Sequence, residues 1–179
     1  LAHAVRDLEP DFEIEADNIP VQSGQIDTLP NPLTYYEEIL DMYINGSLST
    51  IHGDLHLGNI MIGPNNSAFL IDFARTRDGH TVFDWACLEV SLMSDLISPM
   101  IGETWEDIRD AVPVLEAINH QQAVTLPDSE IASALGAIQQ IRKIAAECLA
   151  EPDVWSEYYA ALAMSAFRAV TWSTMYTPA

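Results

Sequence analysis

The chain has 179 residues, 49% of them hydrophobic, which is enough to build one packed domain or one lobe of a larger fold. Its 27 acidic and 7 basic residues give a formal net charge of −20, which argues against nucleic acid or a membrane as partner and could attract a cationic substrate. The favoured interpretation of this charge is a plain solubility surface or a field balanced by a basic segment outside the sequence. With no secretory leader, no apolar run of ~20 residues and two cysteines, the sequence predicts a cytoplasmic protein.

Residues 1–33 predict an irregular connecting segment. Four prolines recur there among acidic residues, and no 3.6-residue apolar period persists. A helix is expected next, with Thr34 as its N-cap and Glu37 at the capping-box position. Asn45-Gly46 would end this helix.

Short strands follow this helix. Residues 49–52 predict one strand, and residues 59–62 and 68–71 predict a hairpin whose turn is Gly-Pro-Asn-Asn at 63–66.

The rest of the chain predicts helices with apolar stripes that pack in a core. We expect four of them, over residues 84–97, 105–120, 128–149 and 152–176, with Asp84 as a cap and Pro113 as a kink. The expected fold class is therefore α+β, mainly α, with a small β-ribbon set on a helical body.

One segment carries most of the functional information. Residues 51–73 read IHGDLHLGNIMIGPNNSAFLIDF, in which Asn59 follows Asp54 by five positions and Asp72 follows Asn59 by thirteen. The predicted hairpin would return Asp72 to the side of the loop. Oxygen-bearing side chains in this pattern suit the placement of Mg²⁺ and a hydroxyl nucleophile around the terminal phosphate of a nucleotide.

This segment closely resembles the catalytic and metal loops of the aminoglycoside phosphotransferase and choline kinase group, which shares the protein-kinase fold. The resemblance implies the C-terminal lobe of a kinase-like fold over residues 34–179, with the two loops at 51–75 and the helical body at 84–176. It also implies an ATP- and Mg²⁺-dependent transfer of the terminal phosphate to a hydroxyl acceptor, a small molecule or a protein. Asp54 would accept the proton of that hydroxyl, while Asn59 and Asp72 would hold the metal.

Further side chains have expected roles around these loops. His52 is expected to hold the two loops in register, and His56 to pack or hydrogen-bond on the acceptor side. The resemblance implies that Asp84 accepts hydrogen bonds from loop amides, and the alternative is a simple N-cap. Arg75 and Arg77 would either contact phosphate or substrate or form local salt bridges, and the acidic surface favours salt bridges.

Residues 70–93, LIDFARTRDGHTVFDWACLEVSLM, resemble a narrower branch, the kinase-like ternary-complex-associated domains of bacterial NTP-dependent conflict systems. The chain departs from kinase-like enzymes in one respect. It has no glycine-rich loop before the motif, and its one lysine is Lys143, far downstream. We therefore expect the ATP clamp on an N-terminal lobe outside this sequence, in a longer parent protein, and little activity from this chain alone.

Two alternatives remain open. The first is a non-catalytic interaction module of a multi-protein system, which would bind a nucleotide or a protein partner without turnover. The second is a zinc hydrolase with His52, Asp54 and His56 as ligands, because alternate residues of a strand project from one face. The zinc reading leaves Asn59 and Asp72 unexplained.

Overall fold

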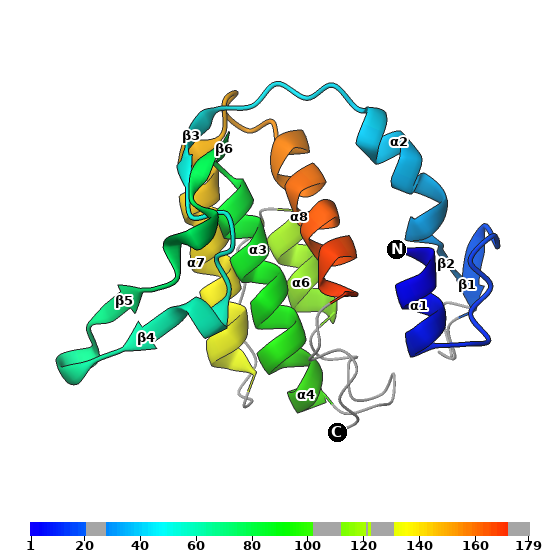
Figure 1. Ribbon diagram of the computed structural model, residues 1–179, viewed down its shortest axis with the longest axis horizontal. Helices are drawn as coiled ribbons and strands as arrows, with labels where there is room; N and C mark the ends of the chain where they lie inside the picture. Colours follow the sequence, from blue (N-terminus) through cyan, green and yellow to red (C-terminus); the bar gives the residue numbers. More distant parts are fainter. Residues whose placement is uncertain (21–27, 102–111, 121, 123–130, 172–179) are drawn as a thin grey trace.

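The computed structural model describes residues 1–20, 28–101, 112–120, 122 and 131–171. The structure is α+β and mainly helical, and its described strands form three two-stranded antiparallel sheets (Figure 1). The expected fold class is confirmed at this level.

The first 33 residues are more regular than predicted. They contain helix α1 (Ala2–Leu8) and an antiparallel pair of strands, β1 (Asn18–Pro20) and β2 (Thr28–Pro30). The prediction of an irregular segment was wrong, because α1 has no buried residue and so leaves no apolar period in the sequence.

Asn31 organises the passage from β2 to the next helix. Its buried side chain donates hydrogen bonds to the carbonyl oxygens of Ile14 and Ala16 and accepts one from the Leu33 N–H. Asn31 thereby caps a 3₁₀ turn (Pro32–Tyr35) that leads into α2 (Tyr36–Asp41). The predicted cap at Thr34 and the predicted end at Asn45-Gly46 were therefore wrong.

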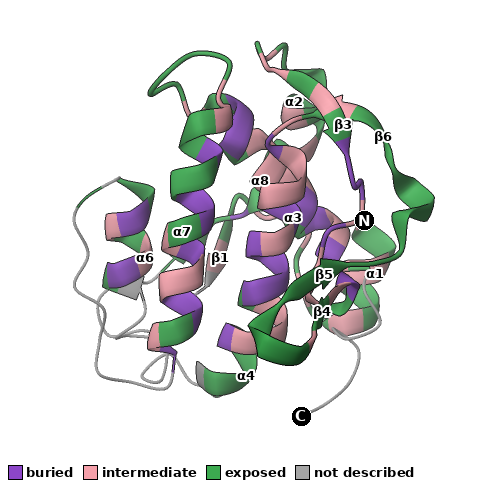
Figure 2. Cartoon of the chain, turned by 90° about the vertical axis from the view of Figure 1, so that its left-hand side faces the viewer, coloured by how far each residue is buried: buried purple, intermediate pink, exposed green. Residues whose placement is uncertain are grey.

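The helical body surrounds α3 (Phe83–Leu92), which lies between α7 (Ala132–Cys148) and α8 (Ser156–Ala169) in Figure 1. A π-helical turn (Met93–Ile97) extends α3 into α4 (Ser98–Ile101), so the helix predicted to end at Ile97 continues further. The buried residues of α3 and α7 lie largely on facing sides (Figure 2). Helix α6 (Val112–Asn119) packs against α7 and contains Pro113 at its second described residue.

Parts of the predicted helices, residues 105–111, 128–130 and 172–176, lie outside the described residues. None of the helices within the described ranges is long and apolar enough to span a membrane.

Two pairs of strands frame the segment 52–59. Strand β3 (Leu48–Ile51) pairs with β6 (Arg77–His80), with Ile51 opposite Arg77. Strands β4 (Ile60–Ile62) and β5 (Ala68–Leu70) form the hairpin, which extends away from the helices at the left of Figure 1. The predicted strand 49–52 and hairpin are confirmed, whereas β6 was not predicted.

Candidate active site

The segment 52–59 is anchored by two side chains of α3. The carboxylate of Asp84 accepts hydrogen bonds from the backbone N–H groups of His52, at 2.6 Å, and Gly53, at 2.9 Å. The hydroxyl of the buried Ser91 accepts a third from the Leu57 N–H at 3.0 Å. The N-cap residue of α3 is Val82, and Asp84 lies in the first turn, so the predicted capping role of Asp84 was wrong. The other predicted role, accepting hydrogen bonds from loop amides, is present in the structure.

Gly53 adopts a conformation that other residues rarely reach. Its φ is +78°, and a β-carbon there would lie 2.4 Å from the carbonyl oxygen of Arg75. The segment can therefore pass close to the chain that follows Asp72 only with glycine at this position.

His52 joins the beginning of the segment to the end of the hairpin. Its Nε2 is 2.8 Å from the carbonyl oxygen of Ile71, the residue before Asp72, and its ring packs at 5.0 Å from that of Phe73. The side chain is buried, so this contact excludes water. The two loops are thus held together through His52.

Asn59 connects Asp54 to the end of the hairpin. Its side-chain amide nitrogen donates to the carbonyl oxygen of Asp54 at 2.9 Å, and its own carbonyl oxygen accepts from the Ile71 N–H at 3.0 Å. The amide nitrogen is therefore in use, which leaves the amide oxygen as the atom that could bind a cation. Asp72 has a left-handed φ of 60°, and among the described residues its carboxylate has one contact, a long one of 3.5 Å with the Ala74 N–H.

The carboxylate of Asp54 faces two guanidinium groups. Arg168 Nη2 lies 2.5 Å from Oδ1, and Arg75 Nε lies 3.5 Å from Oδ2. Arg168 comes from α8, 114 positions later in the chain, and the sequence analysis missed it. A signal was present, because Arg168 is the one basic residue of the otherwise largely apolar helix α8.

The remaining predicted residues contact the backbone. Arg77 donates from Nη1 to the carbonyl oxygens of Gly53, at 3.4 Å, and Arg75, at 3.2 Å, while its guanidinium lies 5.6 Å from the centre of the Phe83 ring. His56 accepts the Gly58 N–H at Nδ1 and so caps the 3₁₀ turn Leu57–Asn59. These contacts shape the loop.

The chain is similar to a known protein family. Residues 7–171 match the model of the family described as ternary complex associated domain 9. The chain belongs to this family. No curated protein and no solved structure matches it significantly. The ternary-complex-associated part of the prediction from residues 70–93 is thereby confirmed, whereas its kinase-like character, its place in conflict systems and the wider likeness to aminoglycoside phosphotransferases remain predictions.

The donor atoms of this ternary complex associated domain suit a hard cation better than zinc. Within the described ranges, no group of three or more His, Cys, Asp and Glu side chains could hold a metal ion. The zinc alternative, with His52, Asp54 and His56 as ligands, therefore has no support in this part of the chain. An amide oxygen from Asn59 and a carboxylate from Asp72 are the hard oxygen ligands that Mg²⁺ takes, and Mg²⁺ commonly binds one or two protein groups together with phosphate oxygens.

Proposed function

We propose that this chain is the catalytic lobe of an ATP- and Mg²⁺-dependent phosphotransferase with a kinase-like fold. The observation that carries the proposal is the pair of hydrogen bonds made by Asn59, one to Asp54 and one to Ile71 beside Asp72. These bonds hold the backbone of Asp54, the side chain of Asn59 and the residue before Asp72 together, which supports the proposal that the three side chains serve one site. Phosphoryl transfer requires this positioning more than it requires covalent help from the protein.

In the proposed reaction, Asp54 orients the acceptor hydroxyl and takes its proton. The acceptor oxygen forms a bond to the terminal phosphorus, and the bond from that phosphorus to the bridging oxygen breaks, so the nucleoside diphosphate leaves with the electron pair. Arg168 and Arg75 hold the Asp54 carboxylate while leaving it further lone pairs. Asn59 and Asp72 would hold Mg²⁺, which neutralises charge on the phosphoryl oxygens when bound.

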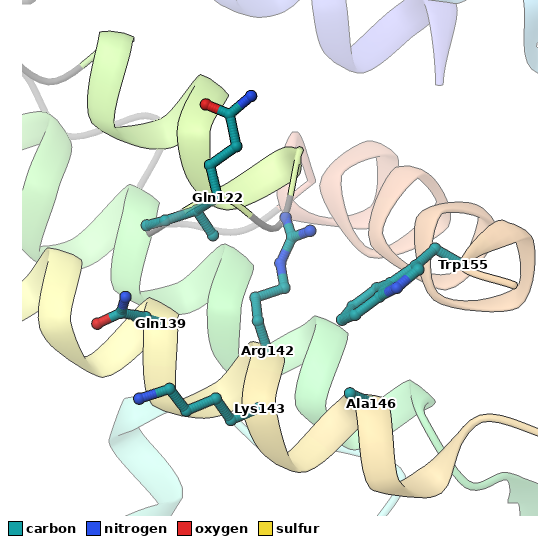
Figure 3. Close-up of a pocket in the computed structure, with 7 residues that line it drawn as sticks. Gln122, Gln139, Arg142, Lys143, Ala146 and Trp155 are labelled. Atoms are coloured by element: carbon teal, nitrogen blue, oxygen red, sulfur yellow. The ribbon is translucent and has the colours of Figure 1, made fainter. Parts of the chain in front are cut away.

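The nucleotide clamp is proposed to lie on an N-terminal lobe of a longer parent protein. Lys143 is the one lysine of the chain and lies on α7, where it lines a cavity (Figure 3) that includes no residue of the loop at 51–75. The hairpin β4–β5 would face that proposed lobe, because the hairpin lies between Asn59 and Asp72 in the chain and leaves apolar side chains uncovered. These side chains are Met61, Ile62, Phe69 and Leu70, each 47% exposed or more.

The test is transfer of the terminal phosphate of radiolabelled ATP by the parent protein, with and without Mg²⁺. Asp54→Asn and Asp72→Asn are each expected to lower the rate by ~100-fold or more. Asp153→Asn is the matched control, because Asp153, like Asp72, has a positive φ, of 64°, which asparagine also tolerates. Equal rates in all three variants would refute the assignment of these residues.

A second candidate is a non-catalytic module that binds protein partners. The family description favours it, since a ternary complex associated domain is expected to meet other proteins. So do the uncovered apolar side chains of the hairpin, because large exposed apolar patches often mark interfaces. Two results together would favour this candidate. The parent protein would bind nucleotide without turnover, and Phe69→Ser would no longer bind a protein partner that the wild type binds.

A further inference from the structure

We propose that Asp95 positions the turn that carries Asn59, and that it acts through the hydroxyl of Ser91. Asp95 lies on the π-helical turn Met93–Ile97, which follows α3. Its carboxylate oxygen Oδ2 accepts a hydrogen bond from the Ser91 hydroxyl at 2.8 Å, and the Ser91 oxygen accepts one from the Leu57 N–H at 3.0 Å. The inference rests on the proposed function, because it assigns a positioning residue to the proposed metal ligand Asn59.

The end of α3 brings the Ser91 and Asp95 side chains together. Ser91 lies in the last turn of α3, and Asp95 follows it by four positions, a spacing at which side chains share one helix face. The π-helical turn begins directly after α3, and single turns of this kind often occur at functional sites. The second carboxylate oxygen of Asp95 accepts a hydrogen bond from the Ser94 hydroxyl at 3.1 Å. Two hydroxyl donors therefore fix the orientation of this carboxylate.

The Asp95 carboxylate decides how the Ser91 hydroxyl is used. A hydroxyl has one proton and an ionised carboxylate can only accept, so the Ser91 proton points at Asp95 and the oxygen lone pairs remain for the Leu57 N–H. In a helix, a serine hydroxyl otherwise tends to donate to the carbonyl oxygen four residues earlier, which would direct its lone pairs differently. Ser91 is fully buried, so water does not replace Asp95 as its partner. A charged acceptor also strengthens the next hydrogen bond in such a chain.

The Leu57 N–H connects this chain of hydrogen bonds to the proposed metal site. Leu57 is the first residue of the 3₁₀ turn that ends at Asn59. The Asn59 side chain is buried and donates a hydrogen bond to the backbone of the same segment, so its position depends on the turn. The Gly53 amide, near the start of the segment, is held by Asp84 instead. Loss of the hydrogen bonds at Leu57 should therefore loosen the turn while the start of the segment stays in place.

The experiment measures amide hydrogen exchange in the full chain by NMR, which requires no phosphoryl transfer. Asp95→Ala should raise the exchange rate of the Leu57 amide about tenfold, the equivalent of one hydrogen bond, and leave that of the Gly53 amide unchanged. Asp95→Asn should recover part of the protection, because an amide oxygen still accepts the Ser91 proton without the charge. Glu147→Ala is the matched control, since it removes one negative charge from an exposed position of α7 and should change neither rate.

The route through Ser91 is tested by combining two substitutions. Ser91→Ala removes the acceptor of the Leu57 N–H, so adding Asp95→Ala to it should raise the exchange rate of Leu57 no further. In the parent protein, Asp95→Ala should raise the Mg²⁺ concentration that gives the half-maximal rate about tenfold, because residues that orient a metal ligand affect metal affinity to this extent.

The proposal is overturned if Asp95→Ala leaves the Leu57 amide protected, if it speeds exchange at Leu57 and Gly53 alike, or if its effect persists in the Ser91→Ala background. An unchanged Mg²⁺ dependence in an active parent protein would equally overturn the link to Asn59. Because exchange is independent of turnover, an inactive parent protein would refute the proposed function, while a local change at Leu57 would still support the role of Asp95.

Discussion

Distant parts of the chain meet at Asp54. The backbone carbonyl of Asp54 accepts a hydrogen bond from Asn59, while its side-chain oxygens contact Arg75 from the following loop and Arg168 from α8. Its side chain is 21% exposed, so a substrate hydroxyl could still reach it. An ion pair to a partly buried carboxylate fixes its orientation more firmly than an exposed pair would.

Arg168 is therefore expected to position Asp54. In the proposed reaction, Arg168→Gln should lower kcat by ~10- to 100-fold and change the KM for nucleotide little, because the carboxylate loses its orientation while the metal ligands remain. Arg168→Lys should recover part of the rate, and steady-state kinetics of the parent protein measures both. A wild-type kcat in Arg168→Gln would show that the contact has no part in positioning.

At the scale of the elements, four helices meet at one buried polar cluster. Glu89 of α3 accepts hydrogen bonds from Arg142 of α7 and from the Tyr158 hydroxyl of α8, the latter at 2.6 Å, while Arg142 also donates to Asn119 of α6. These hydrogen bonds offset the free-energy cost of taking the polar groups of the cluster out of water. The cluster thus fixes how the helices around α3 are arranged.

Tyr158 gives this cluster a pH dependence. Burial, and then the neighbouring Glu89 charge, raise the pKa of Tyr158 above its ordinary value. Because the folded-state pKa is raised, the unfolded chain releases the proton first, and this contribution to the free energy of unfolding declines as pH rises above ~10. Tyr158→Phe should flatten that decline and cost ~1–2 kcal/mol at neutral pH, where a hydrogen bond to Glu89 is lost.

Urea unfolding between neutral and alkaline pH measures both effects. Tyr159→Phe is the control, since its hydroxyl donates to the Asn119 carbonyl and not to Glu89, and it should keep the alkaline decline. If Tyr158→Phe declines as steeply as the wild type, the titration of Tyr158 does not contribute.

At the scale of the whole molecule, the net charge of −20 opposes folding, because compaction brings like charges together. Raising the ionic strength from ~10 mM to ~200 mM shortens the screening length from roughly 30 to 7 Å and should raise the Tm by several degrees. Calorimetry or circular dichroism in sodium chloride measures the change. A Tm that is constant or falls with salt would show that surface ion pairs outweigh the repulsion.

The local structure of residues 51–73 and the helical framework of the fold could be predicted from the sequence. Asp54, Asn59 and Asp72 lie within a span of 19 residues, and a local turn suffices to return Asp72 to the loop. The hairpin followed from apolar runs around a Gly-Pro-Asn-Asn turn, and α3, α7 and α8 followed from apolar stripes. These patterns depend on near neighbours, which a sequence contains directly.

Other elements lacked such a pattern. Strand β6, Arg-Asp-Gly-His, has no apolar alternation and is a strand because β3 offers it hydrogen-bond partners. Helix α1 buries nothing, and the cap of the following turn is set by the contacts of Asn31 with Ile14 and Ala16. Such elements depend on partners elsewhere in the chain.

The sequence by itself determined the ternary-complex-associated family, the mainly helical class and the hairpin. Only the tertiary structure decided that Arg168 meets Asp54, that Ser91 anchors the loop, and that Arg142 pairs with Glu89 in the core. The physical reason is distance along the chain. Contacts such as Arg168 with Asp54 form when packed helices bring far segments together, and no local pattern records which segments will meet.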